Sequence, residues 1–297
     1  GCQTANSIYN VFKANSTNID SVKIPVKIIN ASDDEYEKIT IRTNSQNGIS
    51  EKDLVSISNI QKDLEDLLSK NKFISKSFSY KRQNSIENDS SVDVDYVVSI
   101  NDILRAVFST ILFIPHKVSG YFDKTTSNLI DVIFEDRFIK LYQITVSIYK
   151  VVDDYIEENH SDFKKLRYHL LYLLYRTANK SVNIDALEKY FIKEKNRKSF
   201  EELEGEELQE QTELINSVYS NLYALNNENI LKKTIDYIIS VVKDKYTQLT
   251  FLDTREKEKI LYKTVDKNQR GERIFEDFDT NFTKSIDEIK KEINGTE

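Results

Sequence analysis

From about residue 97 onward, apolar side chains recur at the spacing that places them on one face of an α-helix. Runs of this kind extend over Ile103–Ile111, Phe138–Ile156, Phe163–Leu174, Ile230–Val242 and Ile274–Ile289. Little interrupts them, because the 297 residues include only 6 glycines and 2 prolines. The spacing has no fixed repeat, so it predicts an irregular helical bundle and not a solenoid.

The first 95 residues mix strand and helix signals. Val22–Ile29 is typical of a buried strand, and Phe73–Tyr80 alternates like a short one. Between them, Leu54–Leu68 has helical spacing. The polar stretch 83–95 predicts an exposed loop. We therefore expect an α+β, predominantly helical protein, with a small α/β lobe at 1–95 and a helical region at 96–297.

Charge, cysteine content and the length of the apolar runs limit the cellular compartment and the kinds of binding partner that we expect. The net charge of −7 argues against a broad DNA-binding surface, but it is compatible with a small basic pocket. A single cysteine rules out an internal disulfide, and no apolar run is long enough to span a bilayer, so we expect a cytoplasmic protein without membrane contact. The chain contains no Met and starts on what resembles the turn after a strand, which predicts that the small lobe is truncated on its N-terminal side.

Two polar clusters in the small lobe are the candidate ligand site. The first cluster begins with Gly1, and its backbone N–H groups at a helix start would accept an anion. The second is rich in amides, which can read a base or sugar edge. An ordinary helix cap for the first cluster and a helix end for the second are the competing interpretations. The candidate ligand-binding residues of both clusters are Gly1, Gln3, Thr4, Asn6, Asn44, Gln46 and Asn47.

Arg42, Tyr80 and Arg82 complete the candidate site, since they could neutralise phosphate and stack on a base. A solvated strand end is the competing and simpler interpretation of these residues. Cys2 has no histidine near it in sequence, so no catalytic residue is assigned, and it stays open whether this chain is an enzyme.

Three further groups favour structural interpretations. The three histidines lack metal-binding spacing, and the acidic stretch from Asp153 to His160 is typical of a solvated face, so no metal site is predicted. The Glu-rich run at 201–213 fits a wet surface or an acidic interaction patch. Tyr168, Tyr172 and Tyr175 form a stripe that belongs to a core or an interface.

The order of several motifs resembles the AIPR family, the abortive-infection phage-resistance proteins of bacteria. The motifs are GCQT at 1–4, VKII at 26–29, NSQN at 44–47 and YKR at 80–82, where Lys81 replaces an expected Glu. A more distant similarity connects residues 1–4 with the ParB/sulfiredoxin-like lobe, in which a turn at a helix start binds nucleotide phosphates. Thr4 stands where that lobe has an arginine, so Arg42 or Arg82 would have to supply the charge. The resemblance implies that the two polar clusters face each other across one cleft.

Three hypotheses remain open at this stage. In the first, a phage-defence protein binds a nucleotide or a nucleic-acid end in its small lobe, and an upstream domain supplies nuclease activity. The second is an ATP-using enzyme like the ParB/sulfiredoxin relatives. The third is an interaction module that senses a phage or host protein through its helical surface, its acidic run and the tyrosine stripe. The identity of the ligand, the trigger and a homo-oligomeric state are all left open.

Overall fold

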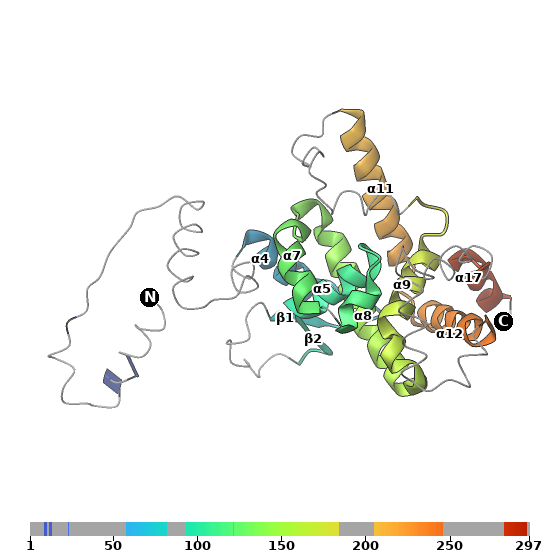
Figure 1. The fold of residues 1–297 in the computed structure, drawn as a ribbon, viewed down its shortest axis with the longest axis horizontal. Coiled ribbons are helices and arrows are strands. Elements are labelled where there is room, and N and C mark those ends of the chain that lie inside the picture. The colour runs from blue at the N-terminus through green and yellow to red at the C-terminus, as the bar shows by residue number, and fades with distance from the viewer. Residues whose placement is uncertain are drawn as a thin grey trace. The chain divides into compact units, whose positions relative to one another are not determined.

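The computed structural model describes residues 9, 10, 12, 13, 23, 58–81, 93–120, 122–183, 205–245 and 282–295. By its internal contacts the chain divides into two compact units, Gly1–Gly48 and Ile49–Glu297. Almost all described residues belong to the second unit, and the fold below is that of this unit (Figure 1). The division expected near residue 95 stays a prediction, and the described residues on either side of that position pack together in the second unit.

Helices make up most of the described part of the second unit, as the apolar spacing predicted. In chain order its elements are α4 (Asn59–Lys70), β1 (Phe78–Lys81), β2 (Tyr96–Ser99), α5 (Ile100–Thr110), α6 (Pro115–Gly120), α7 (Phe122–Ile133), the 3₁₀ turn η3 (Asp136–Phe138), α8 (Ile139–Asn159), the 3₁₀ turn η4 (Ser161–Leu166), α9 (Arg167–Ala178), α11 (Glu206–Tyr223), α12 (Glu228–Lys245) and α17 (Ile286–Asn294). The predominantly helical α+β class is therefore confirmed.

The start of α5 shows how local sequence sets a helix boundary. The side chain of Ser99 accepts a hydrogen bond from the backbone N–H of Asp102, and the Asp102 carboxylate accepts one from the backbone N–H of Ser99. This capping box satisfies two backbone groups that the first turn would otherwise leave unpaired. The helix predicted from the run Ile103–Ile111 is confirmed, Ser99 is its N-cap, and Pro115 begins the next helix, α6.

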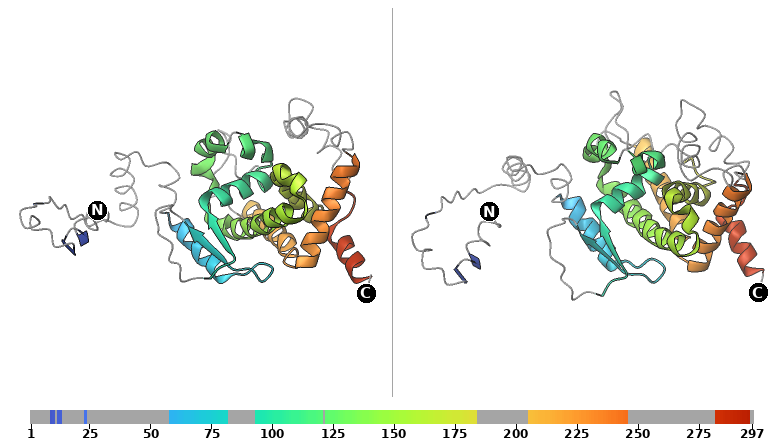
Figure 2. Two further views of the ribbon diagram at one scale, coloured as in Figure 1. Left: turned by 90° about the horizontal axis from the view of Figure 1, so that it is seen from below. Right: turned by 60° about the horizontal axis from the view of Figure 1, so that its bottom comes forward.

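The core is built around α8, which packs against α4, α5, α9 and α11 (Figures 1 and 2). Residues on every side of its N-terminal half are buried, from Leu141 to Tyr149. The neighbouring α9 is buried almost throughout and includes all three tyrosines of the predicted stripe. Tyr172 and Tyr175 both contact the ring of Phe113, at 5.6 and 6.2 Å between centroids. The stripe is therefore core, and it offers no exposed surface to a partner.

The sheet of the described residues is small and parallel. Strand β1 pairs with β2 in the register Phe78↔Tyr96 to Lys81↔Ser99, and Phe78 stacks on Tyr96 at 5.3 Å. Two short strands alone are marginally stable, so the pair depends on α4, α5 and α8, which pack against it. Sequence patterns predicted β1 but missed β2, whose residues were assigned to the helical region.

Candidate functional site

The predicted ligand site lies almost entirely outside the described residues. This holds for Gly1, Gln3, Thr4, Asn6, Arg42, Asn44, Gln46, Asn47 and Arg82. The exception is Tyr80, whose side chain is 3% exposed and whose hydroxyl donates a hydrogen bond to Oε1 of Gln61. Tyr80 thus belongs to the packing between β1 and α4, and the ligand-binding role of the whole set stays a prediction.

The acidic stretch at the end of α8 is engaged in pairwise contacts. Asp153 forms an ion pair with Arg167 at 2.8 Å, and Glu157 forms one with Lys164. The lysine lowers the pKa of Glu157. Within the described ranges, no group of three or more His, Cys, Asp or Glu side chains could hold a metal ion. The arrangement here is that of a surface of ion pairs around the α8–α9 junction.

Asp236 is the point at which α8 and α12 are connected through polar side chains. Its Oδ1 atom accepts a hydrogen bond from the Tyr155 hydroxyl at 2.9 Å and lies 2.9 Å from Nε2 of His160. The rings of Tyr155 and His160 meet edge to face at 5.6 Å, and the ammonium of Lys232 lies 5.5 Å from the centre of the Tyr155 ring. Burial, followed by the hydrogen bond and the charge of Asp236, raises the pKa of Tyr155 to about 12.

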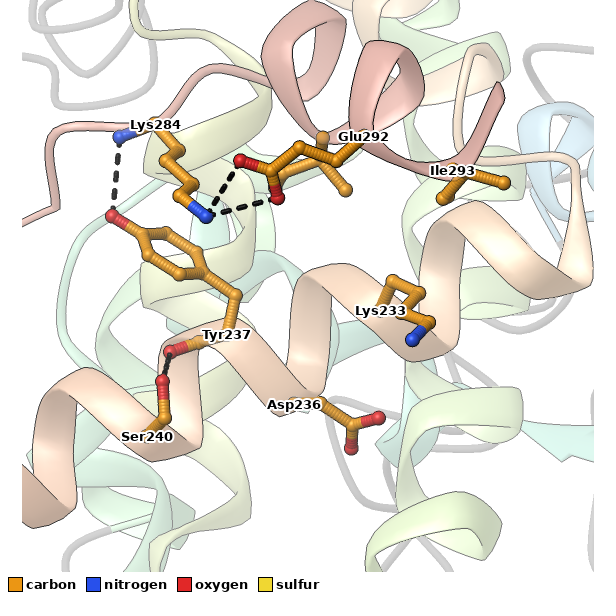
Figure 3. A pocket seen from close by; sticks show the side chains of 8 residues that line it. Lys233, Asp236, Tyr237, Ser240, Lys284, Glu292 and Ile293 are labelled. Atoms are coloured by element: carbon orange, nitrogen blue, oxygen red, sulfur yellow. Dashed lines mark hydrogen bonds and ion pairs between the residues drawn. The ribbon is translucent and has the colours of Figure 1, made fainter. Parts of the chain in front are cut away.

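Asp236 also lines an open cleft of about 460 Å³ between α12 and α17 (Figure 3). One wall consists of side chains from α12, and the other consists of side chains from α17 and the residue preceding its cap. The lining residues are Lys233, Asp236, Tyr237, Ser240, Lys284, Ile289, Glu292 and Ile293. The volume lies within the range of about 300–1,000 Å³ that is usual for small-molecule sites.

One end of the cleft is closed by contacts within the protein. The backbone N–H of Lys284 donates to the Tyr237 hydroxyl at 3.1 Å, and its ammonium pairs with Glu292 at 2.8 Å while lying 5.5 Å from the centre of the Tyr237 ring. Ser240 donates to the backbone carbonyl of Tyr237 at 2.7 Å. The two contacts between Lys284 and Tyr237 join the start of α17 to α12, and the side views in Figure 2 also show the two helices lying together.

At the other, open end of the cleft, one polar atom of Lys233 and one of Asp236 have no partner among the described residues. Among the described residues, Lys233 has neither an ion pair nor a hydrogen bond, and Oδ2 of Asp236 accepts no hydrogen bond. Lys233 and Asp236 are three positions apart on α12, which makes their side chains neighbours on one helix face. Figure 3 shows both side chains extending from neighbouring turns of α12.

A comparison with models of known protein families identifies the family of the chain. Its sequence matches the family model for AIPR proteins over residues 1–294. The chain belongs to the AIPR family. Membership suggests a role in abortive-infection phage defence, in agreement with the resemblance of the N-terminal motifs. No curated protein and no solved structure matches the chain.

In this AIPR protein the cleft was not predicted from sequence, although part of its signal is local. Lys233 and Asp236 interrupt the apolar pattern of α12 on one face, which marks a polar stripe but not a site. The contact between His160 and Asp236 joins residues that are 76 positions apart, and no local pattern reports it. No helix of the described residues is long and apolar enough to cross a membrane.

Proposed function

We propose that this AIPR protein acts in phage defence by binding a nucleotide or a nucleic-acid end through its N-terminal polar clusters. In this proposal, the glycine turn and Gln3, Thr4 and Asn6 hold phosphate, while Asn44, Gln46 and Asn47 read a base or sugar edge. Arg42 and Arg82 supply the positive charge. The destructive step is nucleolytic and is carried by a domain upstream of this region.

The observation that carries the defence role is the family match, which covers both polar clusters together with the helical unit. The ligand-binding part rests on the chemistry of the clusters. Backbone N–H groups at a helix start favour anions, and amide side chains can both donate and accept. The compact unit contributes a continuous core around α8, which provides a rigid body for regulation or assembly.

A thermal-shift screen of nucleotides and short oligonucleotides tests the ligand-binding part. A ligand that binds only the folded state raises the melting temperature by mass action. We expect a shift for the wild type, and a smaller one for the double variant Gln3→Ala/Asn44→Ala. The matched control is Gln209→Ala/Asn216→Ala, which removes the same side-chain types from the exposed face of α11. A wild type that responds to no nucleotide and no oligonucleotide would refute this part of the proposal.

A second candidate function, a module that senses a phage or host protein, is favoured by the surface of α11. Tyr223 is 52% exposed and stacks on Tyr219 at 6.0 Å. Farther toward the N-terminus of the helix, Glu206, Glu207, Glu210 and Glu213 have no ion pair among the described residues. An exposed tyrosine and, farther along the same helix, carboxylates without ion pairs among the described residues suit a partner with basic side chains.

Phage challenge of cells that carry Tyr223→Ala/Glu210→Gln separates the two functions. If defence is lost while the nucleotide-induced thermal shift is retained, the interaction module is supported. Full defence in this variant would argue against it. The remaining alternative, an ATP-using enzyme, requires that residues 1–297 hydrolyse ATP or transfer its phosphate in a direct assay, and no turnover would dismiss it.

A further inference from the structure

We propose that the open end of the cleft between α12 and α17 binds an α-amino acid with an apolar side chain. The ligand's ammonium group would contact Oδ2 of Asp236, and its carboxylate would contact the ammonium of Lys233. Its side chain would lie against Ile293 and Ile289 of α17. This site is separate from the N-terminal polar clusters and does not depend on the function proposed for them.

Two opposite charges lie at the open end of the cleft, where Lys233 has no ion pair and Oδ2 of Asp236 accepts no hydrogen bond among the described residues. Most ionised groups near the cleft already have partners, such as Lys284 with Glu292 and Lys232 with Glu228. Lys233 and Oδ2 of Asp236 are the exceptions at the open end, among the described residues. A ligand that presents a carboxylate and an ammonium close together complements this pair, because charge-assisted hydrogen bonds are the stronger class.

The carboxylate of Asp236 is held in one orientation before the ammonium group of a ligand binds. Tyr155 and His160 both contact Oδ1 at 2.9 Å from the end of α8, which restricts rotation of the carboxylate, and Oδ2 accepts no hydrogen bond from a described residue. A carboxylate held in this way has lost part of its rotamer freedom before the ligand arrives. Binding therefore costs less entropy than binding to an unrestrained surface aspartate.

The charges that line the cleft favour a ligand of zero net charge. Its lining contains two lysines, Lys233 and Lys284, and two carboxylates, Asp236 and Glu292, so its formal charge is balanced. A polyanion such as a nucleotide would place several negative charges beside Asp236 and Glu292, which is unfavourable. A zwitterion of zero net charge meets no such repulsion.

Apolar side chains also line the cleft and would contact the side chain of the ligand. Ile289 is buried and Ile293 partly buried on α17, and the ring of Tyr237 faces the same cleft (Figure 3). These groups would cover an aliphatic side chain, and this removal of apolar area from water favours leucine over glycine. A volume of about 460 Å³ leaves room for such a residue.

Ligand-observed NMR and isothermal titration calorimetry with the full chain of 297 residues test the site. The probes are L-leucine, N-acetyl-L-leucine without the ammonium, L-leucinamide without the carboxylate, and glycine without the side chain, and AMP is added only as a competitor of bound leucine. We expect L-leucine to bind and each other probe to bind at least ~10-fold more weakly, which is the effect of losing one charge-assisted or apolar contact.

Matched variants locate the binding. In Lys233→Gln, leucine and leucinamide should bind equally, because the partner of the carboxylate is gone. In Asp236→Asn, leucine and N-acetylleucine should become equal for the corresponding reason. The controls are Lys232→Gln, the adjacent lysine that pairs with Glu228, and Asp244→Asn, an exposed carboxylate near the end of the same helix, and both should bind leucine like the wild type. Their unfolding transitions also report whether each variant is folded.

Two results would overturn the proposal: no leucine binding to the wild type at 10 mM (roughly the weakest affinity such contacts would give), or leucine binding that neither Lys233→Gln nor Asp236→Asn changes. Displacement of bound leucine by AMP would also overturn it, because the site is expected to reject a polyanion. None of these outcomes bears on the nucleotide screen with Gln3→Ala/Asn44→Ala, because the two sites share no residue.

Discussion

Replacing Tyr155 by phenylalanine removes one hydroxyl from the polar contact between α8 and α12 and leaves the ring in place. The hydroxyl donates to Oδ1 of Asp236 at 2.9 Å, and such bonds to charged groups contribute about 1.5–3 kcal/mol when they are protected from water. The Asp236 side chain is 45% exposed, so water can replace much of the lost contact. We therefore expect Tyr155→Phe to lower the free energy of unfolding by about 1 kcal/mol at pH 8.

This difference should shrink as the solution becomes alkaline. Burial and Asp236 raise the pKa of Tyr155 from 10.0 to about 12 in the folded protein, so the folded chain keeps its proton where the unfolded chain has lost it. A raised pKa stabilises the fold fully below pH 10, and that stabilisation is lost as the pH rises toward 12. Phenylalanine has no proton to lose. Between pH 8 and pH 11 the advantage of the wild type should fall by roughly 1 kcal/mol, after allowance for solvent screening.

Urea denaturation of both proteins at pH 8, 9, 10 and 11 measures the difference directly, because the other tyrosines and lysines titrate alike in both and cancel. The same comparison in an Asp236→Asn background should show a smaller pH dependence, since the negative charge that opposes ionisation of Tyr155 is then absent. A difference that stays constant from pH 8 to pH 11, or that grows, would refute the reasoning.

Three further predictions concern stability and are checked by urea or thermal denaturation. Ser99→Ala should cost about 1 kcal/mol by removing the cap of α5, while Ser99→Thr should retain most of it, and an equal loss in both would contradict the capping role. Leu64→Ala should cost about 2–5 kcal/mol, because this side chain of α4 is fully buried, and a loss below that range would mean the cavity collapses. The backbone and side chain of Ser77, followed by Lys76, lower the pKa of Asp95 to about 2. The stabilisation by Asp95 is therefore present above about pH 4 and lost as the pH falls to 2, so the melting temperatures of wild type and Asp95→Asn should converge over that range.

Helix existence could be predicted from the sequence where the apolar spacing is long and regular. The run through α12 lies within the observed helix, and the runs through α5 and α8 exceed their helices by one residue each, at Ile111 and Phe138. The start of α5 follows Ser99, whose capping box is a local signal. The run Phe163–Leu174 was expected to be one helix and is instead divided into η4 and α9. Phe163 and Leu166 are buried from a 3₁₀ turn, so the turn preserves their burial and the apolar pattern does not reveal it.

Non-local pairings could not be predicted in the same way. Strand β2 has four residues, and it exists because Phe78–Lys81 pairs with it across a separation of 18 positions. The contact between His160 and Asp236 depends on how α8 packs near α12, and the cleft depends on α17, whose packing position no periodicity specifies. In each case the information lies in tertiary packing, which single-sequence patterns do not contain.

The two tyrosine groups show what does distinguish core from surface in such a chain. Tyr168, Tyr172 and Tyr175 lie at helical spacing, but the positions between them are also apolar, among them Leu171 and Leu174, and a helix that is apolar all round is buried. Tyr219 and Tyr223 have the same spacing, yet serine and asparagine occupy much of the sequence around them, and Tyr223 is exposed. The residues between aromatic positions are therefore more informative than the stripe itself, and a search for a partner of this protein should begin at α11 and not at α9.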